Sequence, residues 1–518
     1  MTITMENGVT RLREIREKNP LGGGQKHIDR QHDREKMTAR ERIDCLLDSG
    51  TFSELGSCVN TTAQRMDGKK SEAPCDGAIV GTGKVNGRRI AVYASDFTVL
   101  GGSIAAQHIQ KCAELIIMAA EWGIPMVWLL DSSGGRLGHQ DVMPAGIDWY
   151  FALMSRYSGV IPQINVLMGP CIAGQAYAPT LCDFLLMSRK TGNLWLGGPR
   201  QTQAATSEQF NKDVGSADYH MALSGTCDVV GDGDKETIIL TRELLSYLPS
   251  NFKDSPPKKD PIDVPGKEVG ELASLIPDDF NKVYDMHEVI KSLVDDGELY
   301  EIKKDYAKNI ITCFCRFNGN VVGLVANNPQ EPGSIMEIDS CDKYYRFLQA
   351  LDAYNIPLVT LVDTPPEVAG EDQEAKGLLR HVGKLIATLV SSTIPKICVV
   401  LREAYSDSGS MLLGAVKGIG TDLCYTWPIS QFAVEASTAD YRKLYGKGIE
   451  DDAYEGYLNR SREKVGVFEI ANTYTSQIVD EVIEPKDTRK KIIEALQITK
   501  NKSVKLPKRA KNHGTCPT

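Results

Sequence analysis

The sequence lacks the residue spacings that are typical of zinc sites. It has no Cys-x-x-Cys, no His-x-x-x-His and no Glu-x-x-His, although it contains 13 cysteines. Such spacings bring two ligands within reach of one ion, so we expect no metal site. An odd number of scattered cysteines favours free thiols in the reducing cytoplasm over a disulfide framework.

Long apolar runs are missing as well. No stretch approaches the roughly 18 apolar residues that a membrane-spanning helix requires. Residues 1–8 contain no apolar core of a signal peptide, so the sequence predicts neither a membrane span nor secretion. We therefore expect a cytoplasmic protein.

The chain also has no surplus of positive charge. It contains 59 Lys and Arg residues and 68 Asp and Glu residues, which gives a net charge of −9. Nucleic-acid binding needs a basic face, so that class of partner is excluded. An anionic coenzyme A ester is not excluded, because a few local cations and helix N-termini can bind its phosphates.

What the chain does contain is the alternation of helical and strand patterns of an α/β protein. Thr38, with Glu41 three residues later, predicts a capped helix start. Asn86-Gly87 lies between the β-branched runs 78–85 and 89–93, which predicts a hairpin. Helical patterns cover about 104–122 and 146–158, and continuous apolar runs at 126–130 and 164–168 indicate buried parallel strands.

The same landmarks occur twice along the chain. Residues 250–270 are rich in proline and lysine and read as a linker, which divides the chain into 1–255 and 256–518. The landmarks after the linker repeat those before it at nearly constant offset: Gly87 and Gly319 (319 − 87 = 232), Pro125 and Pro357 (232), Asp131 and Asp363 (232), Pro162 and Pro395 (233). We interpret this as an internal duplication with halves of roughly 75–250 and 305–490. The alternative to a duplication is that any two α/β units share such turn residues at the ends of their strands and helices.

Small and polar residues come directly after the buried strands of the first half. The carboxyl ends of parallel strands form the edge where open α/β sheets bind ligands. Ala173-Gly174 stands between such a strand and a helical pattern, so its backbone N–H groups are candidates to hold a developing oxyanion. A thioester carbonyl that becomes an enolate is such an oxyanion. The alternative is a packing turn in which small residues let a helix lie close to the sheet.

Several segments are similar to those of a known family. They are Asp-Phe-Thr-Val-Leu-Gly-Gly-Ser at 96–103, Met-Gly-Pro-Cys at 168–171, Tyr-Asn-Ile-Pro-Leu at 354–358, Arg380-His381 and Lys-Asn-His-Gly at 511–514. Over about residues 20–518 the chain resembles the carboxyltransferase subunit of the biotin-dependent acyl-CoA carboxylase/decarboxylase family, which includes propionyl-CoA carboxylases and methylmalonyl-CoA decarboxylases.

The resemblance implies an α/β fold of two tandem crotonase-like (ClpP/crotonase) domains that arose by internal duplication. The N-terminal domain would bind the acyl-CoA, and the C-terminal domain would receive biotin carried in trans on a separate protein. Carboxyl transfer, as carboxylation or decarboxylation, would pass through a thioester enolate held in a backbone oxyanion hole. Two facing domains would pair within a homo-oligomer, in this family usually a hexamer. The biotin carrier and the biotin carboxylase or decarboxylase subunits would be separate chains.

The resemblance also implies positions for the site. The residues expected to be catalytic are Ala173, Gly174, Ser406 and Asp407. Those expected to bind the acyl-CoA are Gly101, Gly102, Ser133, Gly134, Gly135 and Arg136. Those expected on the biotin side are Pro366, Glu367, Val368 and Tyr405.

This sequence departs from the family pattern in both halves. Ala173 replaces a glycine, and backbone donors survive that change if φ at this residue is negative. Asp407 falls opposite Gly174 (407 − 174 = 233), where a carboxylate would repel a developing anion. Two alternatives therefore stay open. One is a biotin-independent acyl-CoA decarboxylase, isomerase or hydrolase that uses the C-domain carboxylates, and the other is a non-catalytic acyl-CoA-binding subunit.

Overall fold

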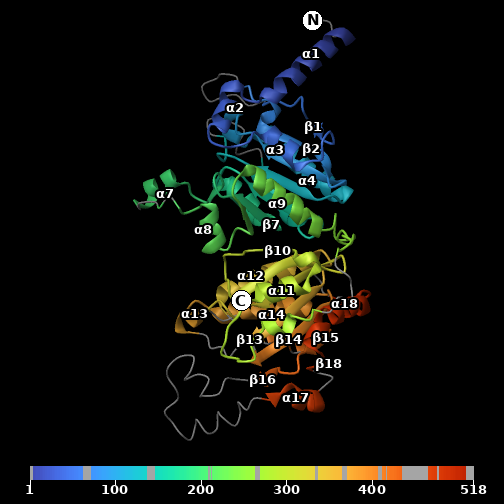
Figure 1. Cartoon of the computed structure of the whole chain (residues 1–518). Coiled ribbons are helices and arrows are strands. Elements are labelled where there is room, and N and C mark those ends of the chain that lie inside the picture. The colour runs from blue at the N-terminus through green and yellow to red at the C-terminus, as the bar shows by residue number, and fades with distance from the viewer. Residues whose placement is uncertain are drawn as a thin grey trace. The chain divides into compact units, whose positions relative to one another are not determined.

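Two units, Met1–Ser255 and Pro256–Thr518, make up the computed structural model of the chain (Figure 1). The structure describes residues 4–61, 72–136, 146–207, 211, 213–262, 269–332, 337–364, 370–405, 411–415, 417–433, 465–474 and 478–508. None of the helices in these ranges has the length and apolar character needed to cross a membrane.

The first unit is built on a seven-stranded sheet that is antiparallel at one edge and parallel elsewhere. Its strands lie in the order β1 (Ser53–Leu55), β2 (Ala78–Val85), β3 (Arg88–Ser95), β4 (Met126–Leu130), β5 (Gln163–Leu167), β7 (Phe184–Ser188), β9 (Val229–Gly231). Asn86 and Gly87 turn between β2 and β3 with φ of 49° and 79°, the left-handed conformation of a tight hairpin. From β3 to β9 every neighbouring pair is parallel. The predicted hairpin and buried strands are confirmed.

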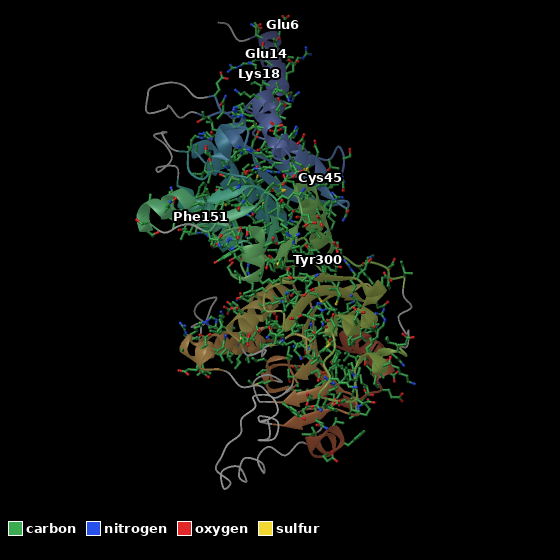
Figure 2. The ribbon with its side chains drawn as sticks, turned by 60° about the vertical axis from the view of Figure 1, so that its left-hand side comes forward. Glu6, Glu14, Lys18, Cys45, Phe151 and Tyr300 are labelled. Carbon is green, nitrogen blue, oxygen red and sulfur yellow. The ribbon has the colours of Figure 1, made fainter. Side chains whose placement is uncertain are left out.

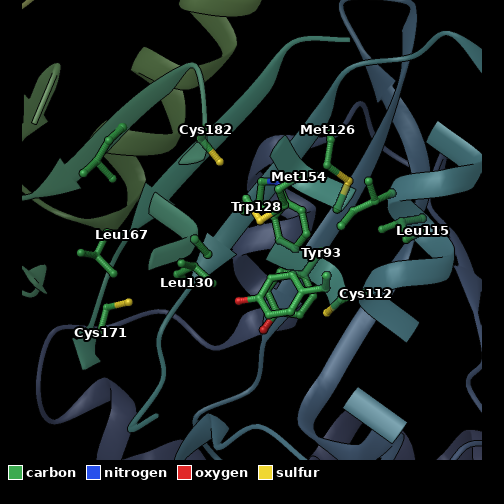
Figure 3. Packing of buried hydrophobic residues seen from close by; sticks show 14 of the residues in the cluster. Tyr93, Cys112, Leu115, Met126, Trp128, Leu130, Met154, Leu167, Cys171 and Cys182 are labelled. Carbon is green, nitrogen blue, oxygen red and sulfur yellow. The ribbon is translucent and has the colours of Figure 1, made fainter. Parts of the chain in front are cut away.

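Helices cover both faces of this sheet. The apolar side chains of α4 (Ala106–Trp122) and α5 (Ile147–Arg156) pack with Tyr93 and Trp128 of the sheet in one core (Figure 3). Because side chains alternate along a strand, residues such as Val127 face the opposite side, where α3 (Ala39–Leu46) and α9 (Asp234–Tyr247) pack. The predicted capping box of Thr38 and Glu41 begins α3. The remaining helices are α1 (Met5–Lys18), α2 (Gln25–His32), α6 (Tyr177–Leu181), α7 (Pro199–Thr206) and α8 (Ala217–Ala222).

The second unit repeats the plan with a nine-stranded sheet. Its main order is β10 (Leu299–Glu301), β11 (Ile310–Phe317), β12 (Asn320–Asn327), β13 (Leu358–Thr364), β14 (Lys396–Tyr405), β15 (Leu423–Thr426), β18 (Glu481–Val482), and β16 (Gln431–Ala433) pairs with β14 and β17 (Val465–Gly466). Among its described residues the α-helices are α10 (Leu272–Leu275), α11 (Met286–Leu293), α12 (Ile338–Ala353), α13 (Glu371–Ala375), α14 (Leu378–Ser391), α17 (Val467–Tyr474) and α18 (Thr488–Thr499).

The duplication extends to individual side-chain contacts. Strand β11 begins 310 − 78 = 232 positions after β2. Lys111, buried in α4, donates to the carbonyl oxygens of Cys75 at 3.2 Å and Ala78 at 2.5 Å. Lys343, 232 positions later, donates to those of Ala307 at 3.3 Å and Ile310 at 2.7 Å, which are again 232 positions later. Each lysine satisfies backbone carbonyls where the chain enters the hairpin, so both halves start their sheets in the same way.

A second repeated contact closes each hairpin. The Asp48 carboxylate accepts from the backbone N–H groups of Asn86 at 3.1 Å and Gly87 at 2.8 Å. Asp295 does the same for Asn318 and Gly319 at 2.9 and 2.6 Å. These aspartates are 295 − 48 = 247 positions apart, so the offset of 232 holds for the sheets but not for the helices before them.

Candidate active site

Three loops at the carboxyl ends of β3, β4 and β5 stack on one another in the first unit. They contain the turn Leu100–Gly102, residues 131–136, and β6 (Pro170–Ile172) with the adjoining turn Ala173–Ala176. The Ser133 N–H donates to the Gly101 carbonyl at 3.0 Å, and the Ser132 N–H donates to the Pro170 carbonyl at 2.9 Å. The middle loop therefore joins the other two.

Glycine makes this close stacking possible at two positions. Gly102 has a φ of 61°, and a Cβ there would lie 2.3 Å from the Asp131 carbonyl oxygen. Gly134 has a φ of 94°, and a Cβ there would lie 3.1 Å from the Ile172 carbonyl oxygen. At Gly102 both the conformation and the space exclude a side chain, while at Gly134 a side chain would be strained by the positive φ and would press on the Ile172 carbonyl. The predicted residues Gly101, Gly102, Ser133, Gly134 and Gly135 thus come together beside Ala173 and Gly174.

The Ala173–Gly174 turn remains accessible at the edge of this stack. Both residues are half-buried, while Ser133 next to them in the middle loop is exposed. The first N–H groups of a helical turn have no partner within that turn. A left-handed residue followed by a helical one also aims successive N–H groups toward one point, which suits an anion. The arrangement can hold an oxyanion.

The backbone at Ala173 differs from the expectation. The condition named for Ala173, a negative φ, is not met: its φ is +56°, so this residue keeps the backbone direction of a glycine at the cost of strain. An L-residue in the left-handed region costs roughly 1–2 kcal/mol, because its Cβ approaches the backbone. The turn is therefore strained where a glycine would be relaxed, and strained residues of this kind concentrate at functional sites.

Arg136 lies beneath the loops and not on their surface. Its side chain is 3% exposed and forms an ion pair with Asp76. It also donates to the Ser103 carbonyl at 2.8 Å and to the Ser103 hydroxyl at 3.2 Å. Asp76 in turn accepts from the His108 N–H at 2.9 Å at the start of α4. Arg136 therefore ties the middle loop to the start of that helix.

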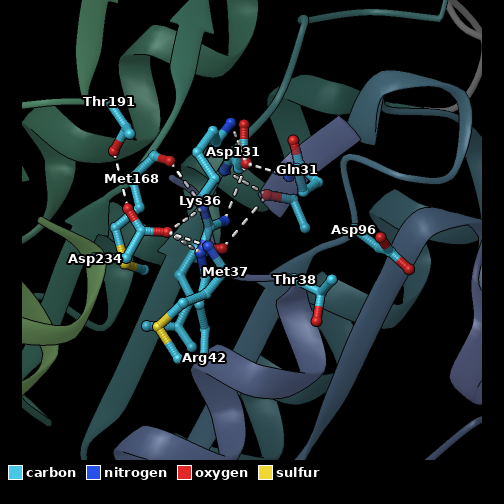
Figure 4. A network of polar contacts seen from close by, with 12 residues as sticks. Gln31, Lys36, Met37, Thr38, Arg42, Asp96, Asp131, Met168, Thr191 and Asp234 are labelled. Carbon is cyan, nitrogen blue, oxygen red and sulfur yellow. Dashed lines mark hydrogen bonds and ion pairs between the residues drawn. The ribbon is translucent and has the colours of Figure 1, made fainter. Parts of the chain in front are cut away.

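A buried network of charges underlies the same loops (Figure 4). One oxygen of Asp131 lies 2.6 Å from the Lys36 ammonium and 3.0 Å from Arg42, and it accepts from Gln31 at 3.2 Å. Arg42 also donates to Asp234 at 2.9 and 2.7 Å and to the Met168 carbonyl at 2.9 Å. Burial lowers the pKa of Lys36 even though Asp131 opposes that shift.

Sequence reasoning missed this network because its members are far apart along the chain. Arg42 is 89 positions from Asp131 and 192 positions from Asp234. The one local signal was an aspartate that comes directly after the buried strand β4. Nothing in the charged N-terminal segment distinguishes Lys36 and Arg42 from surface residues.

The second unit places Tyr405 at the end of β14 and leaves the other predicted residues untested. Tyr405 is fully buried, and its hydroxyl donates to the Gln431 side-chain oxygen at 2.8 Å. The expected residues Ser406, Asp407, Pro366, Glu367 and Val368 lie outside the described residues.

The aspartate that corresponds to Asp131 is also buried in the second unit. Asp363 accepts from Arg402 at 2.9 Å and from the Tyr284 hydroxyl at 2.7 Å. Burial raises the pKa of the Asp363 carboxyl. Both units therefore hold a buried Asp–Arg pair at the end of the same strand. In the part of the chain that the structure describes, no three His, Cys, Asp or Glu side chains gather to hold a metal ion.

Comparison with known proteins identifies the family. The model of the carboxyl transferase domain matches residues 30–514. The chain is 37% identical to a propionyl-CoA carboxylase carboxyltransferase subunit from Haloferax mediterranei, over 99% of this chain and 100% of that protein. It is also 37% identical to the methylmalonyl-CoA decarboxylase subunit alpha of Propionigenium modestum, over 98% of both chains.

A solved structure agrees with this match over the whole chain. Transcarboxylase 12S, a hexamer with methylmalonyl-coenzyme A and methylmalonic acid bound, superposes with a TM-score of 0.90 at 35% identity and 100% coverage of both chains. The expected tandem crotonase-like fold is confirmed. The chain belongs to the carboxyl transferase domain family and is a carboxyltransferase.

Proposed function

We propose that this chain transfers a carboxyl group between biotin, carried on a separate protein, and an acyl-CoA thioester, as a carboxylase or a decarboxylase. The observation that carries the proposal is the half-buried Ala173–Gly174 turn within three stacked loops at the carboxyl edge of the first sheet. Membership of the carboxyl transferase family supports the reaction class.

The first unit would hold the acyl-CoA. Its thioester oxygen becomes negative as the enolate forms, and donors aimed at that oxygen stabilise the charge most in a site that excludes water. We assign this role to the N–H groups of the Ala173–Gly174 turn. Gly101, Gly102, Ser133, Gly134 and Gly135 form the wall beside them. Arg136 acts from below, by holding the middle loop on Asp76.

The second unit would receive biotin. When its carrier docks, biotin supplies or accepts the carboxyl group. The edge of the second sheet fits a second ligand, because it repeats the strand ends and the buried Asp–Arg pair of the first. Tyr405 would act from beneath this edge, since it is fully buried and its hydroxyl donates to Gln431. We assign Pro366, Glu367, Val368, Ser406 and Asp407 to the same side.

We further propose a homo-oligomer that works with a biotin carrier and biotin carboxylase or decarboxylase subunits in the cytoplasm. Transcarboxylase 12S, similar over its whole length, is a hexamer. None of the residues of α1 is buried, and Glu6, Glu14 and Lys18 project from this helix (Figure 2). A single helix of 14 residues gains most of its stability from packing, so a second chain would stabilise it. The 12 cysteines of the described residues are free thiols, which suits the cytoplasm.

The test is carboxyl release from a panel of carboxylated acyl-CoAs, which includes methylmalonyl-, malonyl- and glutaconyl-CoA. Each is run with and without free biotin, and the product is followed by mass. We expect turnover that requires biotin. Turnover that ignores biotin would overturn the proposal and favour a biotin-independent decarboxylase, isomerase or hydrolase that uses the C-domain carboxylates. Tight acyl-CoA binding with no turnover of any substrate would favour a non-catalytic subunit.

A further inference from the structure

Gln175 is a buried polar residue directly after the Ala173–Gly174 turn. Its side chain is 2% exposed, and it lies in the interior near Tyr93, His108, Trp128 and Tyr150. The Gln175 side-chain oxygen accepts a hydrogen bond from the Tyr150 hydroxyl at 3.2 Å. A buried amide without a hydrogen bond is costly. The position of the Gln175 side chain is therefore fixed by its hydrogen bond as well as by packing.

Tyr150 is held as firmly as Gln175. It belongs to α5, is 3% exposed, and packs against Trp128 with ring centroids 6.2 Å apart. Burial raises the pKa of Tyr150, so its hydroxyl stays protonated and donates. Among the described residues, Gln175 and Tyr150 are each other's only side-chain hydrogen-bond partner.

A second contact joins the same two elements. Phe151, the next residue of α5, meets Tyr177 at the start of α6 edge to face, with ring centroids 5.7 Å apart. The turn that contains Ala173 and Gly174 thus leads into two residues, Gln175 and Tyr177, that are both attached to α5.

These contacts bear on the strain at Ala173. If Ala173 relaxed from its φ of +56° to a negative value, the next peptides along the chain would rotate and carry the Gln175 side chain away from Tyr150. The Gln175–Tyr150 hydrogen bond therefore opposes relaxation of the turn. It keeps the N–H groups in the direction that an oxyanion requires.

We propose that Gln175 and Tyr150 are positioning residues that hold the strained Ala173–Gly174 turn in its oxyanion-binding conformation. This inference rests on the proposed function for its effect on turnover, but its effect on the backbone can be measured without substrate. The variant Tyr150→Phe removes only the hydroxyl. Tyr93→Phe is the matched control, because Tyr93 is buried in the same group of side chains and its hydroxyl bonds His108, a residue outside the turn, at 2.7 Å.

The first experiment is hydrogen–deuterium exchange of the full-length protein, read on a peptide that spans residues 172–177. Losing one net hydrogen bond changes an equilibrium by up to about tenfold. We expect Tyr150→Phe to speed exchange of this peptide by about five- to tenfold, and Tyr93→Phe to change it less than about twofold. Equal effects of the two variants, or no effect of Tyr150→Phe, would overturn the inference whatever the enzyme's activity.

The second experiment is a double-mutant cycle with Ala173→Gly, because glycine adopts the left-handed conformation without strain. With a carboxylated acyl-CoA and biotin, we expect Tyr150→Phe to lower kcat by about five- to tenfold with KM nearly unchanged, since only transition-state binding is affected. In the Ala173→Gly background the loss should shrink to less than about threefold. Losses that multiply independently would overturn the inference. A wild-type protein without turnover would refute the proposed function, and the exchange experiment would still decide the role of Tyr150.

Discussion

Replacing Arg42 by methionine tests whether the buried network under the site ties the N-terminal helices to the sheet. Arg42 is fully buried and donates to both Asp131 and Asp234. In Arg42→Met, Lys36 is the one cation that the described residues still offer these two carboxylates, so one negative charge stays buried without a counter-charge. Removing one partner of a buried pair costs about 3–5 kcal/mol, and we expect the free energy of unfolding of the first unit to fall by that amount.

The assay is urea denaturation of the full-length protein followed by tryptophan fluorescence. Four of the five tryptophans belong to the first unit, so fluorescence reports mainly on it: Trp122, Trp128, Trp149 and Trp195. Linear extrapolation of the transition gives the free energy of unfolding, provided that the slopes of variant and parent agree.

Arg40→Met is the control on the same helix. Arg40 pairs with Glu54 at 2.9 Å, but their side chains are 24% and 18% exposed, so solvent screens this pair and we expect a smaller loss than in Arg42→Met. Adding Asp234→Asn to Arg42→Met restores equal charge and should recover part of the loss. If Arg42→Met costs no more than Arg40→Met, the network is not what holds these helices, and the reasoning fails.

Two further predictions rest on local geometry. The neighbouring Glu301 and Asp285 carboxylates raise the pKa of His287 above its ordinary 6.5, so its stabilising contribution is present below about pH 6.5 and is lost as pH rises through the folded-state pKa. The difference in unfolding midpoint between the parent and His287→Gln should therefore shrink from about pH 6 to pH 8, and a difference that grows with pH would contradict this. Gly134→Ala should lower kcat/KM for acyl-CoA about tenfold, because it adds strain at a φ of 94° and a Cβ 3.1 Å from the Ile172 carbonyl. Gly233→Ala, with no atom within 4 Å of its Cβ, is the control, and equal losses in the two variants would exclude the steric explanation.

Most of the secondary structure near the site was predictable because its signals are local. The Asn86-Gly87 turn, the strands 78–85 and 126–130 and the helix that ends at Trp122 are all found where the sequence predicts them. The stacking of the glycine loops was predictable too, because parallel strands bring their carboxyl ends to one edge. The roles of the residues in those loops stay proposals.

The conformation and burial of single residues could not be predicted from the sequence. The residue type does not indicate that Ala173 is left-handed, since alanine rarely adopts a positive φ, and the glycine that the family pattern has at this position was the one signal for it. From the sequence, Arg136 is an ordinary surface cation beside glycines. In the structure it is buried and paired with Asp76, which lies 60 positions earlier in the chain. The hydrogen bond between Tyr150 and Gln175 likewise joins residues 25 positions apart, so no periodic pattern in the sequence indicates it.

The sequence by itself therefore determined the α/β class, the duplication and the loops that meet at the sheet edge, because hydrophobic period, turn residues and repeated landmarks are properties of neighbours along the chain. Only the tertiary structure decided which charges are buried and which backbone is strained. Arg42 meets Asp234 across 192 positions, and Asp48 and Asp295 close equivalent hairpins at an offset different from that of the sheets. Such contacts depend on where folded elements bring distant side chains together, and on the cost of leaving a buried charge or carbonyl without a partner.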